Sequence, residues 1–84
     1  MRINELKQKE VININDGKRF GFVSDVEIDC MCGKIKKIII NSCKKFLGIF
    51  GKELEIQVPW NEIRQIGDDI ILIDVDINEV IEEV

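Results

Sequence analysis

The sequence predicts a small all-β protein built from antiparallel strands, and three observations support that prediction. Apolar and polar residues alternate with a period of two in several short segments, which is typical of half-buried strands. Turn signals rich in Gly, Asn and Asp separate these segments at short intervals. About six short strands joined in this way close most economically into a small barrel.

Size and composition limit the architecture to one domain. A chain of 84 residues supports one compact core but no second domain or deep substrate cleft. Its 45% apolar and 33% charged residues are typical of a globular chain. The sequence contains no apolar run of the ~20 residues that span a membrane and no signal-peptide pattern at its start. Three cysteines without such a signal fit a reducing compartment, so we expect a cytoplasmic protein.

The first half of the chain contains two predicted strands. Residues 10–14 (EVINI) form a short opening strand, and Asn15-Asp16-Gly17 forms the turn after it. Residues 20–29 (FGFVSDVEID) form a half-buried strand with Val23 out of phase. The predicted buried face of this strand contains Phe20, Phe22, Ser24, Val26 and Ile28.

Three more strands are predicted further along. Residues 34–40 alternate poorly, and a β-bulge near Lys36 and Lys37 would bring the isoleucines of this segment onto one face. Residues 54–60 alternate well, but Pro59 cannot donate a backbone hydrogen bond and therefore ends the strand or lies at an edge. Residues 70–75 are apolar on both faces, which predicts a strand that is covered on both sides.

The end of the chain follows a different pattern. Apolar residues repeat at helical spacing from Ile77 to Val84, and the pair Asp76 and Glu79 resembles a capping box. A helix this short cannot stand alone in water, so it must pack on the barrel or on a second copy. We therefore divide the chain into a barrel domain, residues 1–76, and an amphipathic C-terminal tail, residues 77–84.

The order of these segments resembles the PRC-barrel superfamily, in particular its small stand-alone YlmC/YmxH-type proteins from spore-forming bacteria. The resemblance covers residues 1–76 and rests on MRINELKQKEVININDGKRFGFVSDVEID, Gly33-Lys34-Ile35, FLGIFGKE, Pro59-Trp60 and IRQIGDDIILID. It implies a six-stranded PRC-type β-barrel that docks onto a larger partner, and an association with sporulation. The turn Cys30-Met31-Cys32 departs from the polar turn that is usual in relatives.

The sequence gives little support for a metal centre. A structural zinc site uses four ligands, usually Cys or His, whereas this chain offers Cys30, Cys32 and Cys43 and no His. The C-x-C spacing also differs from the C-x-x-C spacing of redox sites. We expect turn or packing cysteines and no bound metal, with a small metal-binding protein as an alternative. One equivalent of zinc in protein purified without a His-tag would contradict this expectation.

Nothing in the sequence indicates catalysis. Without His, the commonest general base is missing, and neither Ser24 nor Ser42 lies in a G-x-S-x-G turn. No glycine loop has the spacing of a nucleotide-binding site. The acidic pair Asp68-Asp69 beside Gly67 is typical of a turn. We therefore predict a protein that is not an enzyme and needs no cofactor.

The loop of residues 41–53 (NSCKKFLGIFGKE) is the candidate binding site. Its predicted partner-binding residues are Lys44, Lys45, Phe46, Leu47, Ile49, Phe50 and Lys52. The two phenylalanines either plug one end of the barrel or form an exposed apolar tip ringed by lysines. An exposed tip would contact a protein partner or, as a second alternative, an anionic membrane. We predict a non-catalytic binding or assembly module, acting through a protein partner or as a homo-oligomer.

The charge distribution raises a different alternative. Residues 1–52 carry eleven Lys or Arg and six Asp or Glu (+5), whereas residues 53–84 carry one and ten (−9). The lysines Lys34, Lys36, Lys37, Lys44 and Lys45 could form a basic face for RNA or the ribosome. A pI of about 4.8 and the lack of interleaved aromatic residues favour a solvated face instead. The asymmetry could also serve a self-complementary pairing, or cancel in space.

Overall fold

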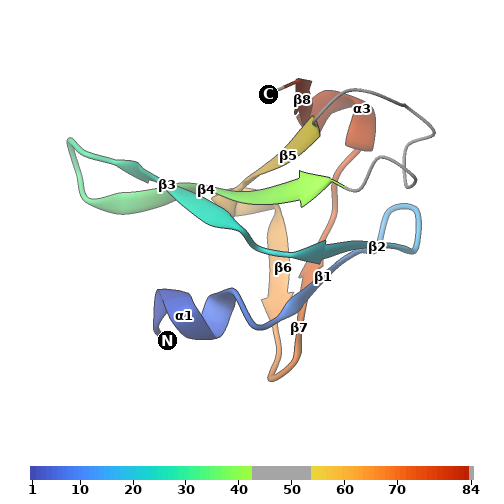
Figure 1. Ribbon diagram of the computed structural model, residues 1–84, viewed down its shortest axis with the longest axis horizontal. Coiled ribbons are helices and arrows are strands. Elements are labelled where there is room, and N and C mark those ends of the chain that lie inside the picture. The colour runs from blue at the N-terminus through green and yellow to red at the C-terminus, as the bar shows by residue number, and fades with distance from the viewer. Residues whose placement is uncertain (43–53, 84) are drawn as a thin grey trace.

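The computed structural model describes residues 1–42 and 54–83 and contains two four-stranded sheets (Figure 1). The first sheet has the strand order β2-β1-β7-β6, and the second has the order β3-β4-β5-β8. The elements are α1 (Ile3–Leu6), β1 (Glu10–Asn13), β2 (Lys18–Phe22), β3 (Asp25–Asp29), β4 (Lys34–Ser42), β5 (Leu54–Pro59), η1 (Trp60–Glu62), β6 (Ile63–Ile66), β7 (Ile70–Ile73), α3 (Ile77–Val80) and β8 (Ile81–Glu83).

The predicted all-β architecture is confirmed, and its details differ from the expectation in two ways. The described residues contain eight short strands rather than about six. All neighbouring strands pair antiparallel except β1 and β7, which are parallel. The parallel pair joins the first strand of the chain to a strand near its end, so the centre of the first sheet depends on a long-range contact. None of the helices within residues 1–42 and 54–83 is long and apolar enough to span a membrane.

The segment 20–29, predicted to be one strand, is divided between the two sheets. The chain leaves the first sheet after Phe22 and enters the second at Asp25. At the crossing, the backbone N–H and the hydroxyl of Ser24 both donate to the carbonyl of Ile39, at 2.8 and 2.9 Å. The predicted face is wrong at two positions. Phe22, beside the crossing, is 54% exposed, and Ile28, at the register shift between β3 and β4, is 48% exposed, whereas Val26 between them packs against the core. Val23, out of phase in the sequence, is buried.

The β-bulge predicted near Lys36 and Lys37 is confirmed in β4. Glu27 lies opposite Lys37 and Ile28 opposite Ile35, which leaves Lys36 as the extra residue. Because of the bulge, Ile38 and Ile35 lie on the same face of β4. Ile38 is fully buried and Ile35 is partly buried.

The strands of the C-terminal half follow the sequence pattern closely, with one exception. β5 buries every second residue and ends at Pro59, as predicted. In β7, Ile71 and Ile73 are fully buried, but Ile70 is 37% exposed, so the prediction that both faces are covered is wrong for this residue. The strand β6, which the sequence did not predict, carries a bulge at Arg64 between the pairs Ile63–Ile73 and Gln65–Leu72.

The tail begins with the predicted helix and ends as a strand. Asp76 caps α3 by accepting a hydrogen bond from the N–H of Asn78 at 3.0 Å. The helix ends after one turn, and β8 then pairs antiparallel with β5, with Ile81 opposite Ile56. The apolar residues of the tail therefore belong partly to one helical turn and partly to a strand at the edge of the second sheet.

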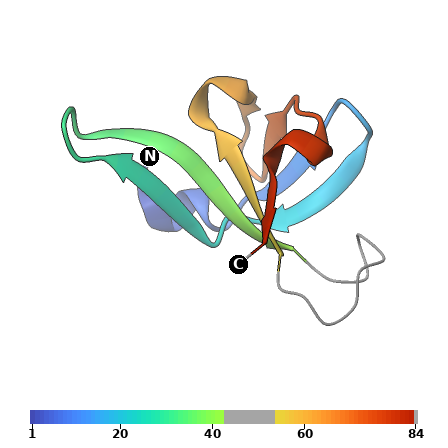
Figure 2. The ribbon, with the colours of Figure 1, turned by 90° about the horizontal axis from the view of Figure 1, so that it is seen from above.

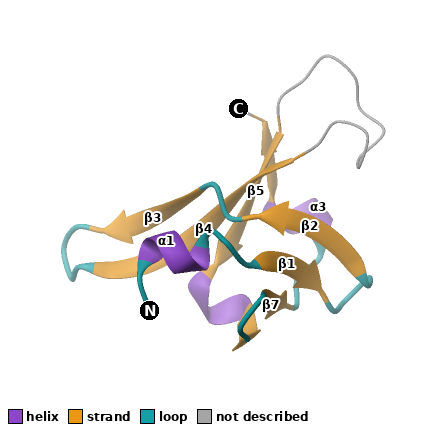
Figure 3. Ribbon diagram, turned by 60° about the horizontal axis from the view of Figure 1, so that its bottom comes forward, coloured by secondary structure: helices purple, strands orange, loops and turns teal. Residues whose placement is uncertain are grey.

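The core lies between the two sheets and is almost entirely apolar. It includes Leu6 from α1, a short helix that the sequence did not predict and that Figure 3 shows ahead of the first strand. The fully or nearly fully buried residues that form the core cluster are Leu6, Val11, Phe20, Val23, Ile38, Ile40, Ile56, Val58, Ile71, Ile73, Val75 and Val80. The buried polar residue among the described residues is Asn13.

Candidate functional site

The predicted docking loop lies outside the described residues. Lys44, Lys45, Phe46, Leu47, Ile49, Phe50 and Lys52 all fall within residues 43–53. The flanking residues are described: Ser42 of β4 pairs with Leu54 of β5. The loop therefore starts and returns at neighbouring positions of two paired strands. Its partner-binding role stays a prediction.

The most prominent described feature is the hairpin of β3 and β4, which we call the arm (residues 25–39). Figures 1 and 2 both show it extending away from the rest of the two sheets. Its tip is the four-residue turn 30–33, where Met31 is 95% exposed. Gly33 has a φ of 73°, which favours glycine, and its N–H donates to the carbonyl of Asp29 at 2.7 Å. The arm thus holds a methionine side chain in solvent on a defined turn.

The carboxylate of Asp29 organises this turn. The N–H of Met31 donates to Asp29 Oδ1 at 2.9 Å, and the thiol of Cys32 also donates to the carboxylate. Both hydrogen bonds favour the ionised form and lower the pKa of Asp29 below its ordinary value of 3.8, with a smaller contribution from the charge of Lys36. Desolvation opposes this shift but does not cancel it.

The pKa of Asp29 gives a testable pH dependence. Because the folded-state pKa is lowered, the carboxylate contributes stability above pH 3.8, and the contribution is lost as the pH falls through the folded-state pKa. We expect an NMR titration of the Asp29 carboxyl carbon to show a midpoint below 3.8 in the folded protein and a normal midpoint in urea. In Asp29→Asn, which retains an acceptor for the Met31 N–H, the dependence should disappear. A normal midpoint in the folded protein would contradict the turn geometry.

The two described cysteines do not converge on a common point in the turn. Both are free and exposed. The Cys30 thiol lies 3.9 Å from the carbonyl of Ile28, whereas the Cys32 thiol contacts Asp29. Within residues 1–42 and 54–83, no group of three or more Cys, Asp or Glu is placed to hold a metal ion. Cys43, the third member of the alternative metal site, lies outside the described residues.

Carboxylates of β3 compensate the lysines of β4. Lys37 forms an ion pair with Glu27 at 3.9 Å and donates to Gln57 Oε1 at 3.0 Å. Lys34 lies opposite Asp29 in the register. In the described part of the predicted basic face, lysines of β4 therefore lie beside carboxylates of β3. Lys44 and Lys45, the other two residues of that face, are not described.

A shallow groove runs along β6, at the free edge of the first sheet. It has a volume of about 340 Å³ and is lined by Trp60, Ile63, Arg64, Gln65 and Ile66. Trp60, Ile63 and Ile66 are partly buried and pack against the core, so their remaining surface faces the groove. The groove therefore has an apolar floor with Gln65 and Arg64 as its polar members.

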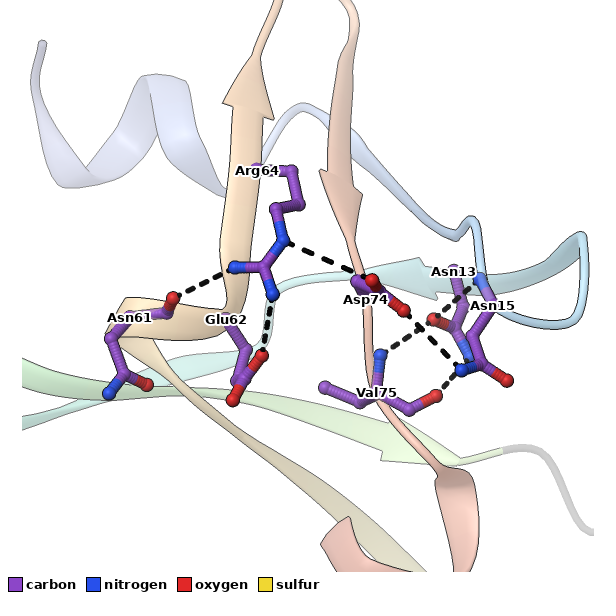
Figure 4. Close-up of polar contacts among 7 residues, drawn as sticks. All are labelled: Asn13, Asn15, Asn61, Glu62, Arg64, Asp74 and Val75. Atoms are coloured by element: carbon purple, nitrogen blue, oxygen red, sulfur yellow. Dashed lines mark hydrogen bonds and ion pairs between the residues drawn. The ribbon is translucent and has the colours of Figure 1, made fainter.

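Arg64, one of the two polar members of the groove, has structural partners (Figure 4). Arg64 donates to the carbonyl of Asn61 and to Glu62, both at 3.1 Å, and lies 4.0 Å from the carboxylate of Asp74. A neighbouring pocket of about 210 Å³ is lined by Glu62, Asp74, Asp76, Glu79 and the apolar residues Pro59, Val75 and Val80. Two of these carboxylates hold Arg64, and Asp76 caps α3. These contacts give Glu62, Asp74 and Asp76 structural roles.

The sequence patterns indicate the lysines and thiols of the arm as alternative candidates, but they do not indicate Met31 or the groove. The strand β6 is hidden in the sequence because the bulge at Arg64 places Ile63 and Ile66 three positions apart, which obscures the period of two.

Comparison with known proteins supports the fold. The PRC-barrel domain family matches residues 1–79. The chain is 44% identical to the "Probable sporulation protein YlmC" of Bacillus subtilis, over 84% of this chain and 88% of that protein. It is 38% identical to the "Uncharacterized protein YmxH" of the same organism, over 89% of each chain. An uncharacterized protein of Clostridium acetobutylicum is 39% identical, over 88% of this chain and 84% of that one.

Proposed function

The chain belongs to the PRC-barrel family, and from that premise we propose that it is a non-catalytic binding module that serves sporulation by docking onto a protein partner. The association with sporulation is supported by the similarity to a relative described as a probable sporulation protein. That similarity covers most of both chains, so it concerns the whole domain.

The composition of the core is the observation that supports a binding role over a catalytic one. Among the described residues, the buried side chains are apolar with the exception of Asn13, and its amide bonds to the backbone of Val75. The interior of the described fold thus holds no ionisable group. Function is then expected at the surface, where loops on a rigid scaffold make contacts.

We place the docking surface on the loop of residues 44–52. Its support is the pairing of Ser42 with Leu54, which anchors both ends of the loop at one end of the second sheet. The apolar residues Phe46, Leu47, Ile49 and Phe50 would then be presented together from a fixed base. Apolar groups gathered on a surface usually mark a protein contact.

The double substitution Phe46→Ser/Phe50→Ser tests this proposal. We expect capture of the partner from sporulating cells to fall at least tenfold, because two aromatic anchors at an interface centre each contribute more than ~1 kcal/mol. Capture by the native chain should depend only weakly on salt, since apolar docking releases few counterions. Quantitative mass spectrometry of the captured proteins gives the readout, and a thermal melt shows whether the variant folds.

The matched control is Ile14→Ser/Phe22→Ser, which removes two apolar side chains that are 50% and 54% exposed elsewhere on the barrel. It should leave capture unchanged. If Phe46→Ser/Phe50→Ser unfolds, the two rings belong to the core and the docking loop is refuted. Steeply salt-dependent capture of RNA would instead support the basic-face alternative.

A further inference from the structure

We propose that the tip of the arm of one copy docks into the β6 groove of a second copy, so that the protein self-associates through a knob and a groove. This interface uses no residue of the loop 44–52 and does not rest on the proposed function. The knob is Met31 with the two exposed lysines that follow it, Lys34 and Lys36. The groove is the apolar floor formed by Trp60, Ile63 and Ile66.

The tip has the properties of a docking knob. Met31 is 95% exposed, although apolar side chains of this size are usually covered. The hydrogen bonds from Met31 N–H to Asp29 and from Gly33 N–H to the Asp29 carbonyl define the turn before any contact is made. A preformed knob loses little conformational entropy on binding. Behind the tip, Ile28 and Ile35 face each other across the strands, and Ile28 is 48% exposed.

The groove suits a methionine. Its volume of about 340 Å³ accommodates an unbranched side chain, and its floor includes the indole of Trp60. A thioether sulfur packs favourably against an aromatic ring, contributing ~0.3–1.5 kcal/mol. The same copy cannot supply the knob, because Figures 1 and 2 both show the arm pointing away from β6. The knob that fills the groove must therefore come from a second copy of the chain.

The charges around knob and groove are complementary. The tip, residues 29–36, carries Asp29, Lys34 and Lys36, a net charge of +1. The segment from Glu62 to Asp69 carries Glu62, Arg64, Asp68 and Asp69, a net charge of −2. Docking the tip here brings opposite net charges together, whereas tip-to-tip contact would bring like charges together. The uneven distribution of charge along the chain would therefore favour this self-association.

The outer strands β6, β3 and β8 favour this mode over strand-to-strand pairing. β6 has its bulge at Arg64. β3 carries the acidic row Asp25, Glu27 and Asp29, and β8 is three residues long with two glutamates. Bulges, like charges and shortness all oppose the addition of a strand. Copies of this chain are thus expected to meet through side chains in a groove.

Sedimentation velocity on the full chain, compared across variants, tests the proposal. The native protein should associate into species that are multiples of 9.7 kDa. Met31→Asp should weaken association about tenfold or more, because it buries a charge in an apolar groove. Gln65→Lys should weaken it severalfold, and Gln65→Glu should tighten it severalfold, since the added charge faces Lys34 and Lys36 across the contact. Phe22→Ser, which removes an exposed apolar side chain from β2 at the opposite edge of the first sheet from β6, should change nothing.

Mixing two of these variants identifies the contact between knob and groove directly. Met31→Asp retains an intact groove and Gln65→Lys retains an intact knob, so an equimolar mixture should form a heterodimer more readily than either variant self-associates. A native chain that stays monomeric at its highest soluble concentration would overturn the proposal. Association as tight in Met31→Asp as in the native chain, or an equal response to Gln65→Lys and Gln65→Glu, would also overturn it. Melting curves that match the native protein confirm that each variant folds.

Discussion

Replacing Asn13 by Leu is expected to lower the free energy of unfolding by ~2–4 kcal/mol. The Asn13 side chain is fully buried, donates to the carbonyl of Val75 at 2.9 Å and accepts from the N–H of Val75 at 3.1 Å (Figure 4). The Asn13 amide thus pairs with both backbone groups of Val75, as a neighbouring strand would, just after β7 ends at Ile73. Leucine has a similar volume but leaves both groups of Val75 unpaired in the core. The melting temperature should fall by roughly 10–25 °C, measured by calorimetry.

Two further variants separate the buried amide from its neighbours. Asn15→Ala removes an exposed contact to Asp74 at 3.4 Å, so it should change stability by less than ~0.5 kcal/mol. Asn13→Asp preserves the acceptor for Val75 N–H but buries a charge and removes the donor. Burial raises the pKa of such a carboxyl, so the folded state binds the proton more tightly and the variant should regain stability as the pH falls. Equal losses for Asn13→Leu and Asn15→Ala would contradict this account.

The sequence predicted the parts of the fold that depend on neighbouring residues. The alternation of Leu54, Ile56 and Val58 and the end of that strand at Pro59 follow from side-chain periodicity and from proline's missing donor. The bulge at Lys36 was visible because Ile35 and Ile38 could share a face only if one residue was extra. The cap at Asp76 was visible from the same kind of local pattern.

Features that depend on distant residues were not predictable from local patterns. The crossing at Ser24 is set by its bonds to Ile39, fifteen residues away, and the parallel pairing of β1 with β7 joins residues sixty apart in sequence. Both contacts change which side chains are buried without changing local composition. The candidate loop could be proposed from composition, whereas the groove along β6 required the path of the chain around Arg64.

The charge asymmetry shows why composition alone misleads about surfaces. The lysines of β4 and the carboxylates of β3 lie within the same half of the chain and compensate each other across one hairpin. The sum of +5 for residues 1–52 therefore overstates the field of the described arm. The remaining difference in net charge lies between the tip of the arm and the segment after Trp60. These are the two surfaces that meet in the proposed self-association.

The N-terminal helix provides the second large expected effect. α1 has four residues, far too few for a stable isolated helix, so its formation must depend on the one side chain that it buries in the core. That side chain is Leu6, which is 1% exposed. Just beyond the helix, Lys9 Nζ donates to the carbonyls of Gly67 and Asp68 at 2.5 and 2.6 Å and ties this segment to the β6–β7 turn.

Leu6→Ala should therefore lower the free energy of unfolding by ~2–5 kcal/mol, the range for removing a large side chain from a packed core. Hydrogen exchange should show faster exchange of the amides that donate in the turn of α1, those of Glu5, Leu6 and Lys7. Ile3→Ala is the matched control, because Ile3 lies in the same helix but is 47% exposed, and alanine favours the helix. It should change stability by less than ~0.5 kcal/mol. If Leu6→Ala costs no more than Ile3→Ala, α1 is an appendage and the core does not extend to the start of the chain.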